Sequence, residues 1–151
     1  IDLTIEYKNL IKFNELYKTN KFLIFPKPIK ASKQILISTF EEGNYYEDSI
    51  INLSEYTKYK IILLLTLFIR DSGMINDFIH GDIHMGNWKV RKVENDYALV
   101  IYDVGICFNV GLKTTRDFYL FWELGDRPNL AKLFRDGIKW YPQHMSLDEI
   151  E

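Results

Sequence analysis

The sequence predicts an α+β fold, forming one domain or part of one, from three observations. Apolar residues recur at helical spacing over residues 3–18 and again over residues 55–71. Short β-rich runs stand at residues 35–40 and 88–102, the second interrupted by a polar turn. The chain has 151 residues, of which 47% are hydrophobic and 26% charged, the composition of an ordinary folded domain. At this length roughly 70% of the unfolded surface can be buried, which supports one sizeable core.

The first predicted helix runs from about Leu3 to Lys18. Four of its residues share one face: Glu6, Leu10, Phe13 and Tyr17. The three hydrophobic members predict a buried stripe, and Glu6 places a carboxylate on that stripe or at its edge. Because the helix dipole favours an acid in the first turn, this position alone does not make Glu6 a site residue.

A strand and a second helix are predicted next. Residues 35–40 are rich in β-branched and apolar types, and the turn-forming residues 41–44 end the strand. Residues 55–71 carry apolar positions at helical spacing and predict the central helix of the core. The dipeptide Ser72-Gly73 is predicted to be the exit of this helix.

Two shorter helices are predicted near the end of the chain, over residues 114–124 and 128–134. Asp117 lies in the first turn of the earlier one and is interpreted as an N-terminal helix acid rather than a site residue. Three large aromatic residues are predicted to be core members: Trp88, Phe121 and Trp122.

The chemistry-bearing residues gather in the middle of the chain. Residues 78–88 read FIHGDIHMGNW and precede an apolar run, a polar turn at residues 94–96, and a second apolar run that ends before Asp103. This order predicts a β-hairpin whose second strand delivers Asp103. We therefore expect the side chains of Asp82, Asn87 and Asp103 to lie close together in the fold.

This set of side chains suits phosphoryl transfer. Such a reaction needs an aspartate that accepts or orients the proton of the attacking hydroxyl, and Asp82 could supply it. It also needs hard oxygen ligands for Mg²⁺, which Asn87 and Asp103 could supply. Glycines beside these residues permit tight turns close to phosphate groups.

A family resemblance lies in two motifs, HGDIHMGN at residues 80–87 and Asp103-Val104-Gly105. Together they resemble the catalytic and metal-binding loops of protein-kinase-like phosphotransferases. The histidine-containing form is similar to the aminoglycoside and choline kinases and to the ABC1 (UbiB, ADCK) atypical kinases. Two features favour ABC1: the glycine of the second motif, and the order of an acidic helix over residues 2–13, then Pro26, then a strand ending at residues 40–43.

The resemblance implies a protein-kinase-like α+β fold, mostly the helical C-terminal lobe with a remnant of the β-containing N-terminal lobe. Residues 1–43 would be the remnant of the small lobe with the hinge, and residues 44–151 the helical lobe with the catalytic and metal-binding loops. No Gly- or Ala-rich phosphate loop, strand lysine or KxGQ signature precedes the first helix. Lys27, Lys30 and Lys33 are expected in a connecting segment, outside the position of the family's lysine.

The resemblance also implies site residues and cofactors. Asp82 would be the catalytic-loop aspartate, Asn87 and Asp103 the metal ligands, and Glu6 the partner of a nucleotide-binding lysine. The backbone at Phe40, Glu41 and Glu42 would face adenine. The implied cofactors are ATP and Mg²⁺, and the implied partners are a nucleotide and an unknown protein or small-molecule acceptor. His80 and His84 are interpreted as loop-bracing residues rather than direct participants.

The implied function is that of an ATP- and Mg²⁺-dependent phosphotransferase or ATPase, and two alternatives stay open. One is a catalytically inactive pseudokinase or nucleotide-binding module, because the upper half of the nucleotide site is missing. The other is a metallophosphoesterase, because Gly81-Asp82-Ile83-His84 imitates a G-D-x-H metal element. That chemistry needs further ligands, and the one histidine downstream is His144.

Charge and hydropathy limit the remaining function classes. The net charge of −2 gives no general attraction to nucleic acid, so no nucleic-acid partner is expected. The longest apolar run, residues 61–69, is far shorter than the roughly 20 residues that span a bilayer, so no transmembrane segment is expected. The single cysteine, Cys107, is interpreted as a packing residue. With no internal disulfide and no signal peptide at the start of the sequence, an intracellular location is expected.

Overall fold

The computed structural model describes residues 2–137 and confirms the α+β class. Its helices are α1 (Leu3–Leu16), α2 (Tyr46–Ile50), α3 (Glu55–Met74), α4 (Leu112–Leu124) and α5 (Arg127–Gly137), with the 3₁₀ turn η1 (Met85–Asn87). Its strands are β1 (Leu23–Ile24), β2 (Pro28–Ala31), β3 (Leu36–Ser38), β4 (Ile79–His80), β5 (Trp88–Val93), β6 (Asp96–Ile101) and β7 (Cys107–Phe108). Within the described part of the chain, no helix has both the length and the apolar character that crossing a membrane requires.

The predicted hairpin is confirmed as the antiparallel pair β5–β6, whose register runs from Trp88–Ile101 to Val93–Asp96. Its tight turn includes Glu94 in the left-handed region, with φ of 53°. The short strand β1 adds to the far edge of β6 in parallel. The hairpin is therefore the base from which the chain reaches Asp103.

The predicted strand at residues 35–40 is present but shorter, as β3, and it pairs with β2 in antiparallel orientation. The expectation that Lys30 lies in a connecting segment was wrong, because Lys30 is part of β2. This strand begins at Pro28, a residue that supplies no N–H to a sheet, so the sequence argued against it. Its one described strand partner is β3, which makes it the kind of edge strand that tolerates proline.

The core forms where α1 meets α3 and the hairpin, and the predicted buried stripe of α1 is confirmed. Leu10, Phe13 and Tyr17 are all buried. The Phe13 ring stacks on Phe25 with 4.9 Å between ring centroids, and it also contacts Phe68 of α3. Burial of such aromatic side chains dominates core energetics, so this cluster fixes α1 against the central helix.

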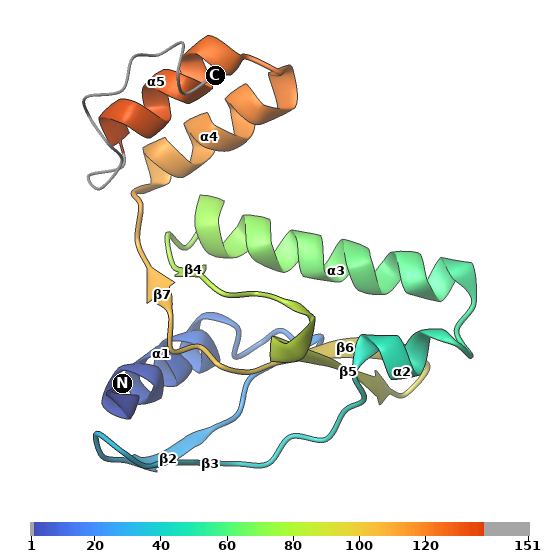
Figure 1. Cartoon of the computed structure of the whole chain (residues 1–151). Coiled ribbons are helices and arrows are strands. Elements are labelled where there is room, and N and C mark those ends of the chain that lie inside the picture. Colours follow the sequence, from blue (N-terminus) through green and yellow to red (C-terminus); the bar gives the residue numbers. More distant parts are fainter. Residues whose placement is uncertain (1, 138–151) are drawn as a thin grey trace.

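Figure 1 shows the long helix α3 between the α4–α5 pair and the remainder of the fold, where α1 and the strands lie. Helix α3 contacts α4 as well as β4 and β6. Ile61 and Phe68 are its most deeply buried large side chains. The prediction that this segment forms the central helix of the core is confirmed.

The predicted exit of the central helix was wrong, because Ser72 and Gly73 lie inside α3 and are both buried. A Cβ atom on Gly73 would lie 3.0 Å from Cγ2 of Thr115, a residue of α4. The glycine therefore permits a close approach between two helices rather than ending one. Helix α3 continues to Met74.

Both late helices are confirmed with shifted boundaries, since α4 begins at Leu112 and α5 extends to Gly137. Helix α4 ends at Gly125, which adopts the left-handed conformation of a helix C-cap. Trp88 is buried, as predicted, but the prediction for Trp122 was wrong because its side chain is 66% exposed. Within residues 2–137, no other helix or strand buries the Trp122 side chain on α4.

A buried polar contact ties α1 to α3 and provides a test of the packing. The Tyr17 hydroxyl donates to Asp71 Oδ2 at 2.7 Å, and Asn76 Nδ2 donates to the same oxygen at 2.8 Å. Burial and the Asp71 carboxylate raise the pKa of Tyr17, so the hydroxyl stays protonated. Tyr17→Phe is expected to lower the free energy of unfolding by about 1–2 kcal/mol in denaturant titrations. The control is Tyr59→Phe on α3, whose side chain is 67% exposed; equal midpoints for the two variants would contradict the prediction.

Candidate functional site

A cavity of about 790 Å³ collects three of the predicted site residues, Glu6, Asp82 and Asp103. They come from α1, from the loop after β4 and from the turn after β6. Leu36 and Ser38 of β3 form another part of the wall. The fold thus brings together acids that lie far apart in the sequence.

The loop that carries Asp82 is held against the turn that carries Asp103. Strand β4 pairs with β7 through Ile79–Phe108 and His80–Cys107, and the Gly81 N–H donates to the Ile106 carbonyl at 2.8 Å. A Cβ atom on Gly81 would lie 2.7 Å from the Phe108 ring, closer than side-chain carbons approach. A glycine at this position therefore allows the Phe108 ring to lie against the backbone immediately before Asp82.

His80 braces this loop from the inside. Its ring is buried, and Nδ1 accepts a hydrogen bond from the Asp82 N–H at 3.2 Å. The other nitrogen, Nε2, lies 3.1 Å from the Tyr102 carbonyl and donates to it in the tautomer that this first bond requires. Both ring nitrogens are therefore occupied by backbone groups, which confirms the loop-bracing interpretation.

His84 also braces the loop, from a more exposed position. Its Nδ1 accepts from the Gly86 N–H at 3.0 Å, and a Cβ on Gly86 would lie 2.9 Å from the ring. Its Nε2 stands 3.9 Å from Asp82 Oδ2, beyond hydrogen-bond distance. The hydrogen bond to Gly86 agrees with the predicted bracing role.

Asn87 lies behind the loop. Its side chain is buried, and Nδ2 donates to the Asp82 carbonyl at 2.9 Å. The Asn87 carbonyl in turn accepts from the Tyr102 N–H at 2.8 Å, which joins the loop to the end of β6. Asn87 is not part of the lining of the 790 Å³ cavity. The predicted convergence of Asp82, Asn87 and Asp103 is therefore direct for the two acids, while Asn87 joins through backbone contacts.

Asp103 occupies a strained turn. Its φ of 46° lies in the left-handed region, which aspartate adopts more readily than most residues. The side chain is exposed, whereas the next residue, Val104, is completely buried. Burial of Val104 therefore anchors a turn that presents the Asp103 carboxylate to the cavity.

Glu6 is half-buried and lies close to Asp103. A Cβ placed on Gly105 would be 3.4 Å from Asp103 Oδ1 and 3.8 Å from Glu6 Oε2, so both carboxylates flank this glycine. Burial raises the pKa of Glu6, and the negative charge of Asp103 raises it further. Within residues 2–137, Glu6 has no hydrogen-bond or ion-pair partner. The cavity accordingly favours a positively charged group between the two acids.

The predicted adenine-facing residues, Phe40, Glu41 and Glu42, lie beside this cavity and not in its lining. The Glu41 carbonyl accepts from the Tyr102 hydroxyl, and the Glu42 carbonyl accepts from Arg91 Nε at 2.7 Å. These contacts hold the segment after β3 against the hairpin. The predicted segment is thus adjacent to the site, while two of its carbonyls already have donors.

Two residues that line the cavity were missed by the sequence reasoning, Ser38 and Tyr102. The Thr39 carbonyl and the Glu41 N–H make no hydrogen bond within residues 2–137, so they are free to pair with a ligand. Period-two alternation from Leu36 would have placed Ser38 on the same face of the strand, and this was the available signal.

Two side chains of the candidate site carry oxygen atoms suited to Mg²⁺. Asp103 offers a carboxylate, and Asn87 retains its amide oxygen because the bond to Asp82 uses the nitrogen. In the part of the chain that the structure describes, no group of three or more His, Cys, Asp or Glu side chains could share a metal ion. The donor chemistry fits a magnesium ion that is also held by phosphate oxygens, and it lends no support to the metallophosphoesterase alternative.

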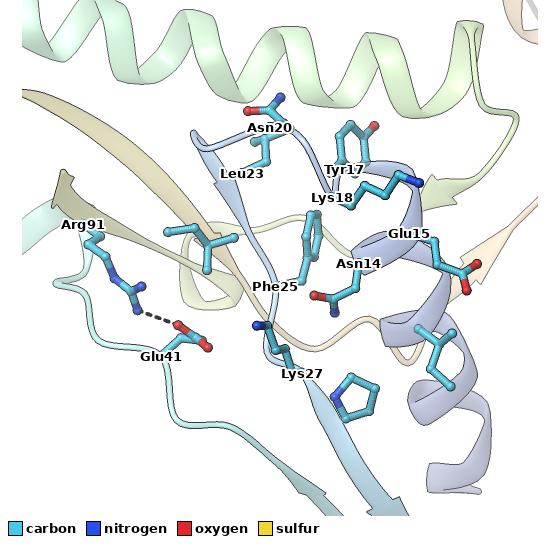
Figure 2. A pocket seen from close by; sticks show the side chains of 13 residues that line it. Asn14, Glu15, Tyr17, Lys18, Asn20, Leu23, Phe25, Lys27, Glu41 and Arg91 are labelled. Carbon is cyan, nitrogen blue, oxygen red and sulfur yellow. Dashed lines mark hydrogen bonds and ion pairs between the residues drawn. The ribbon is translucent and has the colours of Figure 1, made fainter.

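A second cavity, of about 710 Å³, lies along the C-terminal half of α1 (Figure 2). Figure 2 shows Phe25 and Leu23 on its wall and the ion pair between Arg91 and Glu41 at one side. None of Asp82, Asn87 and Asp103 lines it. Its lining includes Glu41, one of the predicted adenine-facing residues, which belongs to the segment after β3.

Cys107, near the same acids, gives a chemical test of this environment. Burial raises the pKa of its thiol to about 12, with Glu6 and Asp103 adding to the effect against an opposing contribution from Lys12. At pH 8 the folded protein is expected to react with iodoacetamide at least about 100-fold more slowly than the unfolded protein, because little thiolate is present. Mass spectrometry of Cys107 over time measures both rates, and equal rates would contradict the buried environment.

Comparison with known proteins identifies similar chains. The family model described as the ABC1 atypical kinase-like domain matches residues 1–132. A "Probable serine/threonine-protein kinase abkC" of Dictyostelium discoideum is 32% identical over 97 residues, which cover 63% of this chain and 14% of that protein. A "Probable serine/threonine-protein kinase abkB" of the same organism is 28% identical over 156 residues, which cover 97% of this chain and 23% of that protein.

A solved structure has a similar fold. It is the complex of Rv3197 with erythromycin from Mycobacterium tuberculosis, with a TM-score of 0.66 and 18% sequence identity. The match covers 99% of this chain and 39% of that one. It supports the predicted kinase-like fold. The chain spans less than a quarter of the length of either curated relative.

Proposed function

Because the chain belongs to the ABC1 atypical kinase-like family, we propose that it contributes the catalytic and metal-binding loops of an ATP- and Mg²⁺-binding phosphotransferase site. The observation that carries the proposal is the meeting of Glu6, Asp82 and Asp103 around one cavity of about 790 Å³. Phosphoryl transfer requires positioned acids and a cation more than it requires covalent participation by the protein. The cavity offers the acids and the volume for a nucleotide-sized ligand.

Asp82 is the residue that orients the attacking hydroxyl and accepts its proton. The Asp82 side chain is exposed to solvent, so the hydroxyl of a phosphoryl acceptor can reach it. The backbone on both sides of the carboxylate is held, by His80 at the Asp82 N–H and by Asn87 at the Asp82 carbonyl. Such restraint keeps the carboxylate in position without using its oxygens.

The nucleotide would lie between β3 and Asp103, both of which contribute to the cavity wall. The adenine base would pair with the free Thr39 carbonyl and Glu41 N–H, and Leu36 would supply apolar contact. The phosphates would lie near Asp103, where Asn87 and Asp103 would hold Mg²⁺. When bound, this ion supplies the positive charge that offsets the triphosphate and the neighbouring acids. Glu6 would pair with a cation from outside residues 2–137, as the lysine partner of the family does.

A pseudokinase is the second candidate, and it applies if no cation pairs with Glu6 in the full-length protein. Without a cation at Glu6, the acids of the cavity oppose the negative triphosphate. A protein of this kind would hold a nucleotide or a partner and transfer nothing. The phosphoryl acceptor of an active enzyme would be a protein, a small molecule or water, and fold alone does not distinguish them.

The test uses the full-length protein. Calorimetric titration with ATP, with and without Mg²⁺, measures binding, and release of ADP measures turnover. Mg²⁺-dependent binding with ADP release supports the phosphotransferase or ATPase. Binding without turnover supports the pseudokinase. A full-length protein that binds no nucleotide under either condition would overturn the proposal.

A further inference from the structure

We propose that Asn9 is a positioning residue that holds the Asp103 turn in its ligand-binding shape by fastening it to α1. This inference rests on the proposed function, because it assigns Asp103 a ligand. The contact is a hydrogen bond of 2.7 Å from Asn9 Nδ2 to the Val104 carbonyl. It joins residues that lie 95 positions apart, and it is a direct link between α1 and the turn.

The turn needs such a restraint for two reasons. Asp103 adopts φ of 46°, a conformation that costs backbone energy for a residue other than glycine. In addition, Asp103 faces Glu6 across Gly105, so two carboxylates of like charge oppose the close approach of α1 and the turn. Asn9 lies one helical turn after Glu6 on α1. Its hydrogen bond therefore holds α1 against the turn close to the point where the Glu6 and Asp103 carboxylates repel each other.

Among the described residues, the Val104 carbonyl has one other donor, the Cys107 thiol at 3.2 Å. A thiol is a weak donor, and Cys107 belongs to the same turn-and-strand segment, so its bond does not connect the turn to α1. Loss of the Asn9 amide would leave the carbonyl of a completely buried residue with the thiol alone. We expect the turn to open toward other conformations once this bond is removed.

The chain contains a matched control on the same helix. Asn14 also donates its side-chain amide to carbonyl groups, those of Leu10 at 2.9 Å and Pro26 at 3.0 Å. It fastens α1 to the chain leading into β2 and lies in the lining of the second cavity, which does not include Asp103. Asn9→Leu and Asn14→Leu make the same substitution on one helix, so they separate a general loss of α1 anchoring from an effect on the turn.

The experiment compares these two variants in the full-length protein. Hydrogen exchange without nucleotide is measured over residues 103–108, and the dissociation constant for Mg-ATP by calorimetry. Asn9→Leu is expected to speed exchange in this segment and to weaken Mg-ATP binding about fivefold or more. Asn14→Leu is expected to change neither, even where its thermal midpoint falls as far. The conservative variant Asn9→Gln, which keeps the amide donor, is expected to restore part of the binding.

Equal exchange and equal Mg-ATP affinity in the Asn9 and Asn14 variants would overturn the inference. If Asn9→Leu does not fold, Asn9→Ser takes its place with the same expected direction. Should the unaltered protein bind no Mg-ATP, the proposed function fails, while the exchange measurement still decides whether Asn9 restrains the turn.

Discussion

Asp82→Asn is expected to lower turnover by about 1000-fold while changing the affinity for Mg-ATP by less than about threefold. The substitution keeps the size of the side chain and removes its capacity to take a proton. The backbone of Asp82 donates its N–H to His80 and accepts at its carbonyl from Asn87; neither bond involves the carboxylate, so the loop keeps its shape. An interaction that acts in the transition state affects the rate and leaves nucleotide binding in the ground state nearly unchanged.

The measurement pairs steady-state kinetics with calorimetric titration on the full-length protein. Asp117→Asn serves as the control, because Asp117 pairs with Lys113 on α4 and lies outside the cavity. It should leave both quantities near their original values. A parallel loss of turnover and nucleotide affinity in Asp82→Asn would instead assign Asp82 to metal binding or to structure.

The features that depend on neighbouring residues were predictable from the sequence. The hairpin β5–β6 required only alternating apolar residues and a polar turn, and both lie within one short segment. The buried face of α1 required only helical spacing. The meeting of Asp82 and Asp103 at one cavity was predictable because both belong to local motifs and the hairpin between them brings the two ends of this segment together.

The features that depend on distant residues were not predictable in the same way. Gly73 looked like a helix end, yet its lack of a side chain serves contact with Thr115, which lies in another helix. Strand β2 begins with a proline and shows no clear alternation, so only its pairing with β3 defines it. The bond from Asn9 to Val104 joins two chain segments whose approach no local pattern encodes.

Among residues 2–137, no Lys or Arg belongs to the lining of the 790 Å³ cavity. The predicted boundary after residue 43, the intracellular location and the cofactors ATP and Mg²⁺ stay predictions. Glu6 has no ion-pair partner within residues 2–137, and burial together with the nearby Asp103 charge raises its pKa. A half-site built of acids is electrostatically incomplete until a cation joins it.

Asp103→Asn is expected to weaken Mg²⁺-dependent nucleotide binding by about 10- to 100-fold, because it removes the strongest anionic ligand from the proposed metal site. Asparagine tolerates the left-handed conformation that Asp103 adopts at φ of 46°, so the turn keeps its shape. Removing this charge also relieves the repulsion with Glu6, and the thermal midpoint of the ligand-free protein should therefore not fall.

Calorimetric titrations of the full-length protein with ATP over a range of Mg²⁺ concentrations measure the binding effect. Asp103→Ala is the companion variant, because it removes the same charge and adds backbone strain; it should show the same loss of Mg²⁺ dependence together with a lower thermal midpoint. Unchanged nucleotide affinity and unchanged Mg²⁺ dependence in Asp103→Asn would remove Asp103 from the metal site. A loss of stability in Asp103→Asn as large as in Asp103→Ala would show instead that the carboxylate itself holds the turn, since the two variants share the missing charge and differ in backbone tolerance.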